Sequence, residues 1–158
     1  MKKEKKQEFI LRITQSNKTQ LVVVLYDMTL AYLEDSIEEF HQGDYEKYRW
    51  NIERAKDCID ELLNSLHMEY EIAGVLKGLY FFYKRELTTA GVKKEKEKIL
   101  PVIEMIKELK ESFEQVALKD TSAPVMENTQ TVYAGLTYGK GSLNVNLADQ
   151  GTNRGFCV

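Results

Sequence analysis

The residues whose types could hold a metal ion are Glu38 and His41, which lie three positions apart within a predicted helix. A di-iron helical bundle needs two inward Glu-x-x-His pairs and two further glutamates. The second pair is missing, because Asn64 stands at the matching position before His67, the other of the chain's two histidines. We therefore interpret Glu38 and His41 as a surface pair and expect no metal site.

The side chain best suited to nucleophilic catalysis is Cys58, which falls inside a helical pattern with no histidine placed to activate it. A small, inert core thiol is the better interpretation. The glycine-rich stretch 139–142 has neither the preceding strand nor the following helix of a phosphate-binding loop. We therefore expect no catalytic residues and no cofactor, and a protein that is not an enzyme.

Charge and cysteine content exclude further classes of function. The net charge is −3 and both lysine runs contain glutamate, so no basic field favours nucleic acid. The two cysteines form no disulfide framework, which favours a reducing, cytoplasmic setting. The longest apolar stretch, residues 21–26, is too short to span a bilayer, and the charged start does not resemble a signal peptide. We expect neither membrane insertion nor export of this chain.

Apolar residues recur at steps of three and four along most of the sequence, which predicts helices. The most regular pattern lies after Asp44, an expected N-cap, where the steps alternate between three and four. We expect Thr19 to cap the preceding helix, Gly91 to end the fourth, and Pro101 to kink the fifth or delay its start to near Leu100. The predicted helices cover residues 2–15, 20–42, 45–66, 72–89 and 94–118.

The sequence predicts an all-α fold, an antiparallel up-down four-helix bundle with a short N-terminal cap helix. This bundle is expected to occupy residues 1–119. Residues 120–158 are rich in Thr, Asn, Gly and Ser and have few apolar side chains. Such a tail cannot bury enough surface to fold alone, so we expect it to be either disordered or docked on the bundle.

The apolar faces of the second and fourth predicted helices are wider than packing against one neighbouring helix in a bundle requires. Surplus apolar surface on two helices favours a groove for an amphipathic partner, although the chain's own tail is a rival occupant. Asp27 follows the apolar run 21–26, near the middle of the widest apolar zone. It either points to solvent or bonds a neighbouring side chain, or it lines the groove and fixes the register of a bound helix through a charge-assisted hydrogen bond.

Several short motifs occur in the same order and at similar spacing as in a known protein family. Residues 12–27 contain the Leu-Tyr-Asp element, and residues 43–47 read GDYEK. Further matching stretches are 56–62, 65–69, 79–80 and 107–113. Over about residues 12–118 the chain resembles the flagellar secretion chaperone FliS family.

This resemblance implies a cytoplasmic, non-enzymatic export chaperone of a bacterium. Its partner would be the C-terminal segment of flagellin, which it would keep from polymerising prematurely; other flagellar export components are further candidates. The element Leu25-Tyr26-Asp27 is the match carried over to the binding surface. The groove is expected to be lined by Leu21, Leu25, Tyr26, Asp27, Met28, Val75, Leu79 and Phe82.

The alternative hypothesis belongs to a different class of function. In it the chain is a structural or regulatory helical bundle whose hydrophobic groove is filled by its own tail or by a second copy. The sparse apolar residues between Val132 and Leu147 motivate it.

Overall fold

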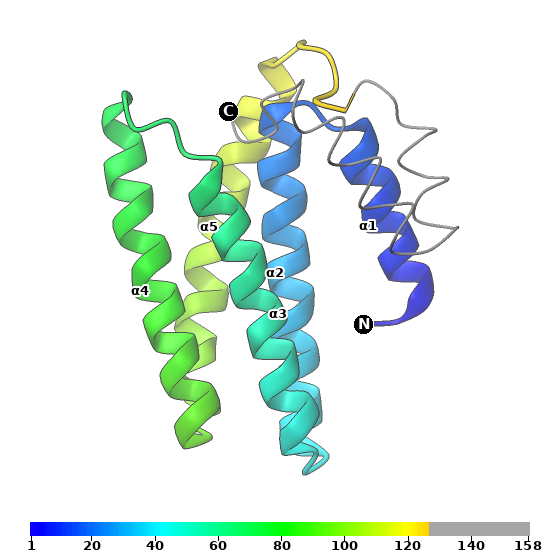
Figure 1. Ribbon diagram of the computed structural model, residues 1–158, viewed down its shortest axis with the longest axis vertical. Coiled ribbons are helices and arrows are strands. Elements are labelled where there is room, and N and C mark those ends of the chain that lie inside the picture. Colours follow the sequence, from blue (N-terminus) through cyan, green and yellow to red (C-terminus); the bar gives the residue numbers. More distant parts are fainter. Residues whose placement is uncertain (127–158) are drawn as a thin grey trace.

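The computed structural model describes residues 1–126, and every regular element within them is a helix. The four long helices alternate in direction, and α1 lies along the outside of α2 (Figure 1). This confirms the predicted all-α bundle with a short N-terminal helix. The elements are α1 (Lys3–Gln15), α2 (Lys18–His41), α3 (Tyr45–Asn64), α4 (Glu71–Lys93), the 3-10 turn η1 (Lys96–Lys98) and α5 (Ile99–Lys119).

Helix α2 is central, since it packs against α3, α5 and α1. Its apolar residues point in several directions for this reason. One set enters the main core, where Tyr26 and Leu33 are fully buried beside Ile52 and Ile59 of α3. Another set, with Val24 and Ala31, meets Phe9 of α1 in a separate small cluster. Most of the apolar surface of α2 is therefore buried within the protein.

The start of α2 is fixed by a capping box. The Asn17 side chain accepts a hydrogen bond from the backbone N–H of Gln20 at 2.9 Å, and the Gln20 side chain accepts one from the N–H of Asn17 at 3.0 Å. These two bonds satisfy donors that a helix N-terminus otherwise leaves free. The expected cap at Thr19 is wrong, because Thr19 already lies in the first turn of the helix.

The other helix ends follow from local chemistry. Asp44 caps α3 as predicted, accepting from the N–H of Lys47 at 3.0 Å. Gly91 does not end α4, because the helix continues to Lys93 and Lys94 adopts the left-handed conformation with φ 57°. Pro101 lies in the first turn of α5, where its missing N–H is tolerated, so the predicted late start is confirmed.

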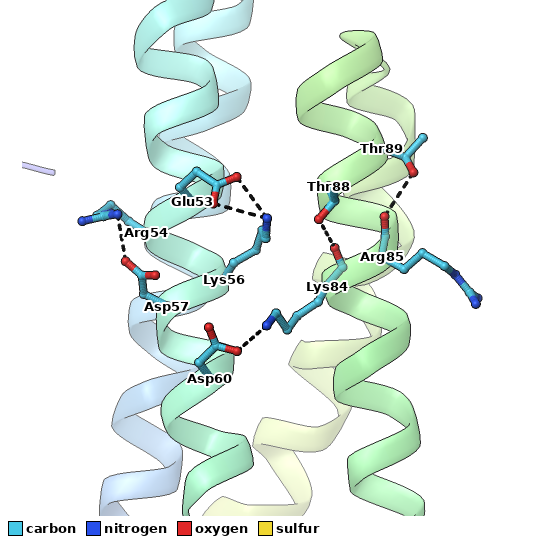
Figure 2. A network of polar contacts seen from close by, with 9 residues as sticks. All are labelled: Glu53, Arg54, Lys56, Asp57, Asp60, Lys84, Arg85, Thr88 and Thr89. Atoms are coloured by element: carbon cyan, nitrogen blue, oxygen red, sulfur yellow. Dashed lines mark hydrogen bonds and ion pairs between the residues drawn. The ribbon is translucent and has the colours of Figure 1, made fainter.

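Polar contacts join α3 and α4 on the outside of the bundle (Figure 2). Lys84 of α4 reaches across to Asp60 of α3, whereas the pairs Glu53–Lys56 and Arg54–Asp57 stay within α3. Such exposed ion pairs stabilise a fold little. The position of α4 therefore depends mainly on its buried apolar residues, which include Leu76, Tyr83 and Leu87.

None of the helices between residues 1 and 126 has an apolar run long enough to cross a bilayer. Helix α5 ends at Lys119, and the described chain continues to Met126 without a further helix. Most of the expected tail, residues 127–158, lies outside the described residues. The division into a bundle and a tail stays a prediction.

Candidate functional site: an apolar groove

An apolar groove of about 530 Å³ lies at the end of the bundle where α2 and α4 begin. The last turn of α3 and the connection to α4 close one side, and Phe113 of α5 closes another. The apolar lining comprises Leu21, Val22 and Leu25 of α2, Leu66 and Tyr70 of the connection, Ile72, Ala73, Leu76 and Tyr80 of α4, Phe113, and Val125. A thin polar rim includes Lys18, Glu61 and His67.

The groove is open because α4 packs chiefly on α3 and touches α5 little. Its rim carries apolar side chains that water contacts directly. Tyr70 is 63% exposed and Ile72 is 61% exposed. Solvated aromatic and β-branched side chains beside an apolar concavity are typical of a surface that buries a partner.

Two tyrosines from opposite walls meet at the floor of the groove. The hydroxyls of Tyr26 and Tyr80 share a hydrogen bond, and the Phe113 ring packs edge-on against Tyr26 with centroids 5.6 Å apart. Burial raises the pKa of Tyr26 well above its ordinary range and that of Tyr80 to about 12. Both hydroxyls therefore stay protonated, and the floor of the groove is neutral.

The structure brings some of the expected groove residues together and separates others. Leu21 and Leu25 line the groove. Tyr26 lies beneath it, fully buried. On α4, Val75 is exposed outside the lining, and two further residues pack against the core instead, half-buried: Leu79 and Phe82.

Asp27 and Met28 lie away from the groove. One carboxylate oxygen of Asp27 accepts from Arg12 of α1 and the other from Lys110 of α5, both at 2.7 Å. The hydrogen bond to Asp27 raises the pKa of Lys110. Asp27 thus ties α1, α2 and α5 together. Met28 packs between the main core and the small cluster under α1.

A second cavity of about 550 Å³ surrounds Asp27 between α1, α2 and α5. Charges of both signs line it, including Lys5, Glu8, Lys107 and Glu111. A lining of this kind suits water and ions better than an apolar segment. Within residues 1–126 no group of three or more His, Cys, Asp or Glu side chains could share a metal ion.

Several groove residues were not expected from the sequence. Tyr70 lies in the connection between α3 and α4, where helical periodicity gives no face to assign. Leu66 was expected in the predicted helix 45–66, but α3 ends at Asn64 and Leu66 lines the groove from the connection. The sequence does contain a signal for this part of the groove, because residues 66–72 place four large apolar side chains in and beside a short connection. Apolar residues in a loop need a partner surface or stay solvated.

The chain after α5 folds back onto the start of α2. We call residues 120–125 the strap. Asn17 Nδ2 donates to the backbone carbonyls of Asp120 and Ser122 at 3.2 and 3.4 Å, and the Val125 N–H donates to the carbonyl of Ser16 at 2.9 Å. These contacts place the Val125 side chain in the groove wall.

Acid should loosen the strap. Hydrogen bonds from Ser122 and Thr19 lower the pKa of Asp120 from 3.8 to about 2. Because the folded-state value is depressed, these bonds contribute stability above about pH 4 and are lost as the pH falls towards 2. NMR titration should show the Thr19 and Ser122 amide shifts following Asp120. Shifts that stay constant over this range would contradict the assignment.

Cys58 should be unreactive in the native state. Burial raises the pKa of its thiol to about 12, so almost none is thiolate in mildly alkaline buffer. We expect a Cys157→Ser variant to react with a thiol reagent only as fast as the protein opens. The same variant in guanidinium chloride, the control, should react at once. Rapid labelling without denaturant would contradict the burial of Cys58.

No curated protein matches the chain. A family model described as the flagellar protein FliS matches residues 1–120, which span α1 to α5 and the first residue of the strap. The matched region includes nearly all of the groove lining. The chain therefore belongs to the FliS family of flagellar secretion chaperones.

Proposed function

We propose that this protein is a bacterial export chaperone that binds the C-terminal region of flagellin in the apolar groove. Family membership supports a flagellar chaperone role. The observation that carries the finer proposal is the groove itself, with a continuous apolar lining and solvated apolar residues at its rim. In the bacterial cytoplasm, this binding would keep flagellin from polymerising before export.

The groove suits an amphipathic helix that folds as it binds. Leu21 and Leu25 lie one turn apart on one wall, and Ile72 and Leu76 lie one turn apart on the other. Such spacing accepts apolar anchors at the i, i+3 and i+4 positions of a partner helix. Burial of those anchors offsets the entropy lost when a disordered segment becomes ordered.

Calorimetry with a peptide from the flagellin C-terminal region tests this proposal. We expect saturable binding with a negative heat-capacity change, the robust sign of apolar burial. A peptide from the flagellin N-terminal region is the control and should not bind. Absence of binding by the C-terminal peptide at tens of micromolar would overturn the proposal.

A further inference from the structure

The strap ends at the wall of the groove. Val125 is the last residue of the strap and also part of the groove lining. Its N–H donates a hydrogen bond to the carbonyl of Ser16, between α1 and α2. The next residue, Met126, therefore starts beside the groove. The chain then continues for residues 127–158. Whatever follows the strap is thus tethered next to an exposed apolar surface.

We propose that residues 132–147 of the same chain bind in the groove and compete there with the partner. Because the groove is the proposed flagellin site, the regulatory meaning of this inference rests on the proposed function. Tail and partner would then be alternative occupants of the groove, and competition from the tail would lower the apparent affinity for the partner.

The sequence of this segment fits an apolar groove. Between residues 128 and 148 the only charged residue is Lys140, in a chain with 30% charged residues. Insertion into the groove would therefore desolvate few charges, which are the costliest groups to bury. The segment also supplies apolar side chains that could replace solvent there: Val132, Tyr133, Leu136, Leu143, Val145 and Leu147.

Tethering makes even weak binding effective. A short flexible linker gives an effective concentration on the order of 1 mM. If the free segment bound with a Kd of about 0.1 mM, the tethered segment would occupy the groove about ten times more often than not. Partner affinity would then fall by about tenfold relative to an open groove.

The test compares three forms of the full chain, which are the natural sequence, a test variant and a matched control. The test variant carries Val132→Asp and Leu136→Asp, which put two charges into the proposed occupant. The matched control carries Thr152→Asp and Asn153→Asp, which add the same charge outside it. Hydrogen exchange of the amides of residues 72–80 reports whether the groove is covered, and calorimetry reports the affinity for the flagellin C-terminal peptide.

We expect the test variant alone to exchange faster at residues 72–80 and to bind the peptide about tenfold more tightly. Equal exchange in all three forms would overturn the inference. Protection that rises with protein concentration would also overturn it, because a second copy would then be the occupant. Failure of the peptide to bind any form would contradict the proposed function, while the exchange measurement would still decide the tail.

Discussion

An Ile72→Asp variant should bind the flagellin C-terminal peptide about 30-fold more weakly than the natural chain. Ile72 is 61% exposed at the groove rim, so the change leaves the core intact. A partner helix that covers this position loses about 1.5–3 kcal/mol of apolar burial and must also desolvate a carboxylate. Each 1.4 kcal/mol is a factor of ten in Kd. Calorimetry measures the effect.

Val92→Asp is the matched control. Val92 is also a β-branched residue of α4 and is 75% exposed, but it lies at the other end of the helix from the groove. We expect this variant to bind the peptide like the natural chain. If both variants lose affinity equally, net charge and not the groove determines binding. If neither does, the partner lies elsewhere on the protein.

Leu33→Ala should lower the free energy of unfolding by about 3 kcal/mol, within the usual 2–5 kcal/mol for truncation of a buried leucine. Leu33 is completely buried in the main core, within the interface between α2 and its neighbours. The substitution removes apolar contacts and leaves a cavity that rigid helices fill poorly. Urea unfolding followed by circular dichroism gives the value.

The comparison variant is Leu118→Ala, in the last turn of α5. Leu118 is 80% exposed, so its truncation should change the free energy of unfolding by less than about 0.5 kcal/mol. A large effect at Leu118 would show that a surface covers this residue in solution. A small effect at Leu33 would contradict the described core.

The bundle could be predicted because its helices are strongly periodic. The three-four alternation after Asp44 became the core face of α3, with Tyr48, Ile52 and Ile59 fully buried. Boundaries were harder, because they depend on single side-chain hydrogen bonds. The Asn17–Gln20 capping box places the start of α2 earlier than its apolar pattern does.

The site was only partly predictable from the sequence, because periodicity gives the width of an apolar face and not what covers it. The surplus on α2 suggested a groove along Leu25–Met28. Helix α1 covers part of the surplus apolar surface of α2. On the same side, the Arg12 and Lys110 side chains form ion pairs with Asp27. Which helix packs against which face is a long-range property that local spacing does not contain.

The two ends of the Asn17 carboxamide have separate structural roles. Its oxygen caps α2, whereas its nitrogen holds the strap. The strap can therefore detach without fraying the helix, since the two tasks share a side chain but no atom. An Asn17→Asp exchange would keep a good cap and turn the strap-facing end into an acceptor aimed at carbonyl oxygens. A change of one heavy atom at this buried position would therefore weaken the strap and leave the cap of α2 in place.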